Sequence, residues 1–170
     1  MGQGNEYRCE ECGYSMTAAY GAGMMYPTVY RETIEKGRAG KLGEKLKTFL
    51  AEHPEGAVNC GNSMIRCTKC GSIESEQNLS MYLPKDGDPV PEEKGIWSVA
   101  MPQEDIAFVC PWDLPGHYRL YARYPHRCSK CGGKARVISE RKLDEGVADG
   151  TVRCPRCGGR LRSMGMILWD

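Results

Sequence analysis

The sequence predicts a small α+β fold, rich in β-structure, built as two lobes with short antiparallel sheets. Three observations predict it. A short cysteine motif occurs four times, a helical stretch lies between its first two copies, and a stretch rich in Pro, Gly and charge divides the chain. The chain of 170 residues has room for one domain or two small ones. It contains only two Phe and three Trp, so each lobe needs a stabilising element besides its apolar core.

The repeated motif is Cys-x-x-Cys-Gly, and its four copies use eight of the ten cysteines. Two intervening residues form a tight turn that directs both sulfurs at one cation, and the glycine permits an open backbone conformation. Two such turns supply four thiolates for one tetrahedral metal site. The sequence therefore predicts two sites with these ligands: Cys9, Cys12, Cys67, Cys70, Cys128, Cys131, Cys154 and Cys157.

Chain order gives the simplest pairing of the turns, in which the first two share one site and the last two share the other. The last two turns are separated by 22 residues, 132–153, which is close to the usual spacing in zinc sites. The first two are separated by 54 residues, 13–66, so an inserted element must return the chain to its start. A crossed pairing between the two halves of the chain is the alternative.

The N-terminal lobe, 1–83, is predicted to carry a two-helix insert at about 28–53. Thr28 can cap a helix over 29–36 that stops at Gly37. We expect the apolar face of the second helix to pack on the sheet around the first metal site. The apolar residues of that face recur at positions i, i+4, i+7 and i+8, and they are Leu42, Leu46, Phe49 and Leu50.

The stretch 84–95 is predicted to be a solvated linker, and 96–170 a basic C-terminal lobe. Strand-like runs occur at several places, and in 118–124 the residues alternate so that Tyr118, Leu120, Ala122 and Tyr124 share one face. We expect the last three of them to form an antiparallel set around the second metal. The predicted strands are 79–83, 96–101, 118–124, 135–139 and 161–169.

The four turns resemble those of the zinc-ribbon group, in which two such turns beside short hairpins hold one structural zinc. The turn Cys154-Pro-Arg-Cys157-Gly158 also resembles the second turn of rubredoxin, an iron electron carrier. The resemblance covers the turns and their flanking strands, roughly a third of the chain, and implies a fold rather than an activity. It implies two Zn²⁺ per chain, with iron as the alternative. Residues 132–153 contain no aromatic side chain to shelter an iron centre, which favours zinc.

The net charge of +1 hides a division along the chain. Residues 1–118 contain 11 Lys+Arg and 17 Asp+Glu, whereas 119–162 contain 12 Lys+Arg and 4 Asp+Glu. Some of the basic residues balance the negative thiolates, and the basic segment can also dock on an acidic protein. Arginine interleaved with tyrosine suits phosphate contact and base stacking, as in proteins that bind single-stranded nucleic acid. The residues predicted to make these contacts are Arg119, Tyr121, Arg123, Lys134, Arg136, Arg160 and Arg162.

A site closed by four thiolates leaves no position for water or substrate. The sequence therefore predicts a non-enzymatic protein with structural zinc that acts through protein or nucleic-acid contacts. The enzyme alternative is a thiol enzyme with Cys110 as nucleophile, His117 as base and Asp113 to orient it. We expect Cys60 and Cys110 to be buried thiols instead, because free cysteine is among the most buried residue types.

The sequence contains no apolar run of about 18 residues and no signal peptide at its start. It is therefore predicted to be a cytoplasmic protein without a membrane partner. In a reducing compartment, ten cysteines favour metal binding over disulfides.

Overall fold

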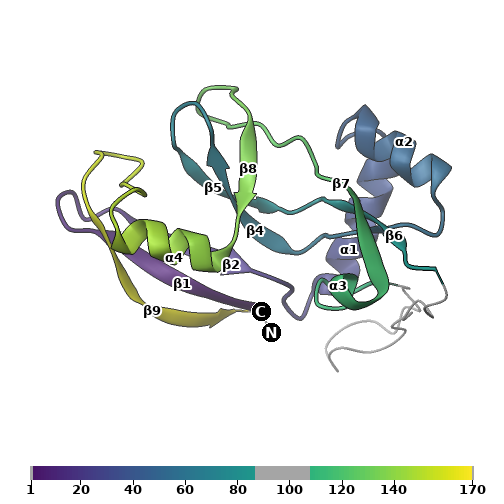
Figure 1. Cartoon of the computed structure of the whole chain (residues 1–170), viewed down its shortest axis with the longest axis horizontal. Coiled ribbons are helices and arrows are strands. Elements are labelled where there is room, and N and C mark those ends of the chain that lie inside the picture. The colour runs from purple at the N-terminus through teal and green to yellow at the C-terminus, as the bar shows by residue number, and fades with distance from the viewer. Residues whose placement is uncertain (1, 87–107, 170) are drawn as a thin grey trace. The chain divides into compact units, whose positions relative to one another are not determined.

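The computed structural model describes residues 2–86 and 108–169, and contacts divide the chain into two compact units (Figure 1). Unit 1 comprises three segments, Met1–Gly21, Asn62–Gln77 and Pro125–Trp169. Unit 2 comprises Ala22–Gly61 and Asn78–Tyr124. This division cuts across the sequential lobes expected at 1–83 and 96–170. Most of the expected linker, 84–95, and the expected strand at 96–101 lie outside the described residues.

Unit 1 contains two three-stranded antiparallel sheets with the orders β2-β1-β9 and β5-β4-β8. In each sheet, a hairpin pairs with a strand from much further along the chain. The strands are β1 (Gly2–Cys9), β2 (Ser15–Tyr20), β4 (Asn62–Cys67), β5 (Ile73–Gln77), β8 (Ala135–Ile138) and β9 (Leu161–Trp169). The mixed α+β, β-rich class predicted from the sequence is confirmed.

One core serves both sheets of unit 1. Helix α4 (Glu140–Ala148) begins after Ser139, whose side chain accepts the N–H of Lys142 as an N-cap. Leu143 and Val147 of α4 are buried in one cluster with residues of both sheets, among them Tyr7, Met16, Met64 and Ile73. The helix lies within 132–153, the segment between the third and fourth turns, where no helix was predicted.

Unit 2 combines the helical insert with a sheet of its own, in the order β3-β6-β7. The predicted apolar face of the second helix is buried at Leu46, Phe49 and Leu50. It packs in a cluster with Val58 and Met81 of the unit 2 sheet, so the expectation that it packs around the first metal site is wrong. The elements of unit 2 are α1 (Tyr26–Arg38), α2 (Glu44–Glu52), β3 (Ala57–Val58), β6 (Met81–Pro84), α3 (Leu114–His117) and β7 (Tyr118–Ala122).

Helix α1 is longer at both ends than predicted. Pro27 lies in its first turn, where the missing N–H costs nothing, and the helix continues past Gly37 instead of stopping there. A Cβ at Gly37 would lie 2.7 Å from Cδ1 of Leu50. The glycine therefore lets the Leu50 side chain of α2 pack close to the backbone of α1. None of the helices in the described part of the chain has the length and apolar character needed to cross a membrane.

The last three predicted strands form near their expected positions, but they lie in three different sheets. The expected antiparallel set around the second metal is therefore wrong. The pairing of β6 with β7 is also irregular, because Met81 lies opposite Ala122 and Tyr82 opposite Leu120. This bulge leaves Leu120 47% exposed although Tyr118 is 3% exposed, so the predicted alternation of faces holds for only part of β7.

Candidate metal centres

The four cysteine turns share one backbone geometry. In each turn, the glycine N–H donates to the carbonyl oxygen of the first cysteine, at distances between 2.9 and 3.2 Å. The φ angle of that glycine is positive, between 67° and 78°, a conformation that side chains resist. The first cysteine of every turn is buried, and the second is partly or fully exposed. The four glycines are Gly13, Gly71, Gly132 and Gly158.

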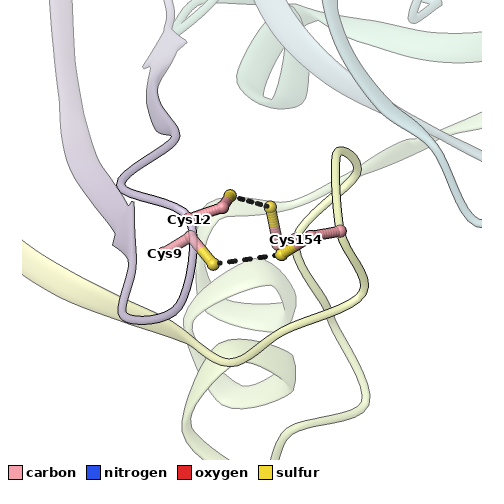
Figure 2. A group of neighbouring side chains, drawn as sticks. Cys9, Cys12 and Cys154 are labelled. Carbon is pink, nitrogen blue, oxygen red and sulfur yellow. Dashed lines mark hydrogen bonds between the residues drawn. The ribbon is translucent and has the colours of Figure 1, made fainter.

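The eight sulfurs gather in two groups, in which the outer turns pair with each other and the inner turns pair with each other. Within a group, all four sulfurs lie within 4.8 Å of one another. Figure 2 shows Cys9, the last residue of β1, and Cys12, in the turn after it, facing Cys154, which precedes β9. The pairing predicted from chain order is wrong, and the crossed alternative is correct. The first centre is Cys9, Cys12, Cys154 and Cys157, and the second centre is Cys67, Cys70, Cys128 and Cys131.

Strand pairing fixes this arrangement, and it does so identically at both centres. In the β1–β9 pair, Cys9 lies opposite Leu161, four residues after the last cysteine of the first centre. In the β4–β8 pair, Cys67 lies opposite Ala135, four residues after the last cysteine of the second centre. Unit 1 therefore contains two copies of one metal-binding arrangement, with the second inserted in the chain between the halves of the first. The residue after the first cysteine makes the same backbone hydrogen bond at both centres. The N–H of Glu10 donates to the carbonyl oxygen of Arg160, and the N–H of Thr68 donates to that of Lys134.

The separations between sulfurs suit a tetrahedral metal ion. Across each centre, sulfurs of the two turns lie 3.5 and 3.7 Å apart. Zinc–thiolate bonds of about 2.3 Å place the sulfurs of a tetrahedron about 3.8 Å apart. Each group of four cysteines can therefore hold a metal ion with four protein ligands. Both groups belong to unit 1, and among the described residues unit 2 contributes no sulfur to either.

Backbone N–H groups favour the thiolate form of two ligands. The N–H of Cys70 donates to the Cys67 sulfur at 3.4 Å and is the main cause that lowers the pKa of Cys67 to about 6. The N–H of Cys12 is the main cause that lowers the pKa of Cys9 to about 7. Burial, in contrast, raises the pKa of Cys128 to about 12. Four thiols this close ionise together only when a cation balances them, so each centre is suited to a metal ion.

The two centres differ in one neighbouring side chain. At the second centre, Glu74 follows Cys70 by four residues. At the first centre, the equivalent position after Cys12 is Met16. Oε1 of Glu74 lies 3.2 Å from the Cys128 sulfur, and Oε2 accepts the N–H of Ser129 at 3.1 Å. Met16 is buried in the core of unit 1. The second centre therefore has a carboxylate beside one sulfur, which the cysteine motif alone gave no reason to expect.

The residues predicted to contact nucleic acid are all exposed, but the two units divide them. Arg119, Tyr121 and Arg123 belong to unit 2, on β7 and just after it. The ring of Tyr121 packs against Phe49 and His53, with centroids 5.3 and 5.1 Å away. The ring of this tyrosine is therefore already in contact with aromatic side chains of its own unit.

The other four predicted contact residues lie in unit 1 at equivalent positions of the two centres. Lys134 and Arg136 lie three and five residues after Cys131, the last cysteine of the second centre. Arg160 and Arg162 lie three and five residues after Cys157, the last cysteine of the first centre. Two further basic residues, Arg66 and Lys142, were not predicted to form a site but line a cavity with Arg136. Arg66 lies in the acidic part of the sequence, 1–118, so the division of charge gave no reason to select it.

The two cysteines outside the centres are packed in unit 2, as expected. Cys60 is 1% exposed and Cys110 is 0% exposed, and both belong to its apolar core. Burial raises the pKa of Cys60 far above its usual range. Asp113 and His117 lie at the two ends of α3 and are joined through the backbone N–H of His117. In this structure the proposed nucleophile, Cys110, has no exposed surface for a substrate to reach.

Comparison with known proteins finds no family model that matches the sequence, no similar curated protein and no similar solved structure. The functional argument therefore rests on the geometry of this chain.

Proposed function

We propose that this is a non-enzymatic zinc-binding protein whose two centres each hold one structural Zn²⁺. The proposal is carried by the closed set of four sulfurs at each centre, with separations that suit a zinc–thiolate tetrahedron. Four protein ligands leave no coordination position for water or substrate, so the metal supports folding rather than catalysis.

Zinc is favoured over iron by the surroundings of the sulfurs. Cys70 and Cys157 are exposed, and solvent exposure is one of the factors that sets the reduction potential of an iron–sulfur centre. The segment 132–153, which joins the two centres along the chain, contains no aromatic residue, although Tyr7 and Tyr14 belong to the apolar cluster around the first centre. The exposure of these two sulfurs is what supports a structural metal rather than a rubredoxin-like electron carrier.

The test is metal analysis of untagged protein purified without added metal. Elemental analysis and native mass spectrometry should find about two zinc ions per chain, and the visible spectrum should be featureless. Iron with a thiolate charge-transfer band would replace the proposal with an electron carrier. Recovery of the folded protein with neither metal would refute the structural role of both centres.

A cytoplasmic location belongs to the same proposal. All ten cysteines lie in the described part of the chain, and none of them forms a disulfide. Eight of them serve the two centres and two are buried in unit 2, which supports a reducing compartment.

For the partner, the proposal is single-stranded nucleic acid, with an acidic protein as the alternative. Overall charge does not support it, because unit 1 has 13 Lys+Arg and 9 Asp+Glu, a net of +4. Two zinc–tetrathiolate centres with a formal charge of about −2 each would cancel that value. The support comes from the distribution of charge, since exposed basic residues occupy equivalent positions on or just before β8 and β9, namely Lys134, Arg136, Arg160 and Arg162.

The partner proposal is tested by fluorescence anisotropy with labelled RNA and single-stranded DNA of mixed sequence. Binding at low salt that weakens steeply as salt is added is the expected result, because the basic side chains would displace counterions from the phosphates. No binding at low salt would leave the acidic protein as the partner to pursue.

A further inference from the structure

A cavity of about 380 Å³ lies beside the second centre, entirely within unit 1. It is lined by β4, β8, the turn after β4 and α4, and three of its lining residues are cations, Arg66, Arg136 and Lys142. We propose that this cavity binds one phosphate group of a nucleic-acid backbone. The inference rests on the nucleic-acid contact proposed above and assigns it a site.

The fold brings these three cations together. Arg66 on β4 lies directly opposite Arg136 on β8, so both side chains leave the same face of the sheet. Like charges in directly opposed positions destabilise a strand pair. Lys142 adds a third positive charge from the first turn of α4. An anion bound between them would relieve this repulsion.

Within the described residues, no carboxylate lies at salt-bridge distance from any of the three cations. Arg66 donates one N–H to the carbonyl oxygen of Thr151 at 2.7 Å, and its guanidinium group retains further donors. Asp149 interacts with Arg66 only at longer range, and its carboxylate accepts the N–H of Thr151 at 2.8 Å.

The cluster has a partial counterpart at the first centre. Arg8 and Arg162 form the equivalent opposed pair there, but Arg162 lines a cavity that also contains Glu10 and Asp144. The cavity at the second centre has no carboxylate in its lining, although the metal ligand Cys67 is one of its lining residues. The three cations of the second cavity therefore lack the carboxylates that accompany Arg162.

The lining also indicates the chemical class of the ligand. Arginine presents donors in a planar fork that suits phosphate oxygens, and three cations suit a charged oxyanion better than a neutral group. The remaining lining includes Thr68, Val137 and Ile138, with no aromatic side chain on which a base could stack. The site therefore recognises phosphate and sugar rather than sequence.

The test compares salt-dependent binding of a labelled mixed-sequence RNA and its DNA counterpart by wild type, Arg136→Gln and Lys142→Gln. The matched control is Arg141→Gln, which removes the same charge one residue away. Arg141 is outside the cavity, paired with Glu145 at 2.7 Å, and its side chain is 76% exposed. Zinc content and thermal transition of each variant confirm folding. The Nε–Hε NMR signals of Arg66 and Arg136 report contact directly.

We expect each cavity variant to bind at least about threefold more weakly, with a salt slope smaller by about 0.7, and the control to bind like wild type. Both arginine signals should shift when oligonucleotide is added. If wild type binds but the cavity variants match the control, the cavity is not the phosphate site and the nucleic-acid proposal survives. If wild type binds no oligonucleotide, both fail. Tight binding of inorganic phosphate or a mononucleotide without binding of strands would overturn the backbone assignment.

Discussion

The sulfurs of Cys9 and Cys157 lie 3.5 Å apart although the residues are 148 positions apart in the chain. In the second centre, the sulfurs of Cys67 and Cys131 are equally close across 64 positions. The loop closed by the first centre therefore encloses the loop closed by the second. The entropic cost of closing a loop rises only slowly with its length, so loss of either metal should have a similar effect on unit 1.

Replacing a ligand should affect unit 1 and spare unit 2. Cys157→Ser and Cys131→Ser should each reduce the zinc content from about two ions per chain to about one, because three thiolates no longer close the site. Thermal unfolding followed by NMR should show early loss of the signals of both sheets of unit 1, since they share one core. Cys60→Ala, a change outside both centres, should keep both metals. A Cys131→Ser protein with two zincs and an unchanged transition would contradict the ligand assignment.

Zinc affinity at both centres should rise with pH. All four thiols of a centre must lose their protons, and the pKa values of Cys67 and Cys9, about 6 and about 7, let these two ionise readily near neutrality. Cys128, whose burial raises its pKa to about 12, must release a proton when zinc binds. Acidification through pH 7 and then 6 protonates Cys9 and Cys67 and so weakens binding. Competition with a chromophoric chelator at several pH values measures the effect, and a flat profile would count against it.

The eight ligands and the turn geometry could be predicted because both are local. The spacing of two residues and the following glycine set the direction of two sulfurs without help from the rest of the fold. The strand at 161–169 was also predicted with its bounds, since apolar residues and β-formers run through it. The class of fold followed from these local features together.

The pairing of the turns could not be predicted because long-range strand pairing decides it. The 22 residues between the third and fourth turns resembled an ordinary loop of a zinc site, but they contain β8 and α4. A signal for α4 was present in Ser139 as N-cap and in Leu143 and Val147 four positions apart. Recognition of that helix would have shown that the segment belongs to a core rather than to a simple connection.

Removing the carboxylate beside the second centre should strengthen zinc binding there. Glu74 lies 3.2 Å from the Cys128 sulfur and disfavours its thiolate, whereas glutamine has the same shape without the charge. Glu74→Gln should therefore raise the zinc affinity of the second centre several-fold, measured by chelator competition. Glu76→Gln, on the same strand but not beside a sulfur, is the control. Weaker zinc binding by Glu74→Gln would show that the carboxylate supports the site instead.

Chelation of the metals should separate the two units. The core of unit 2 is formed by apolar side chains such as Phe49, Val58, Met81 and Phe108, and neither centre contributes to it. Treatment with a strong chelator should abolish the dispersed NMR signals of β1, β4, β8 and β9. The helical circular dichroism from α1 and α2 should persist. Collapse of both sets of signals at one chelator concentration would mean that unit 2 depends on unit 1 for its fold.

Truncation of a core residue in unit 2 should leave the metals in place. Leu46 is fully buried between α1 and the rest of the core, so Leu46→Ala should destabilise unit 2 by about 2–5 kcal/mol. Leu120→Ala, at a leucine that is 47% exposed, should cost far less because little apolar area leaves the interior. Urea titration followed by the NMR signals of α1 and α2 measures the loss, and zinc content should stay at about two in both variants. Loss of zinc from Leu46→Ala would show that the centres require an intact unit 2.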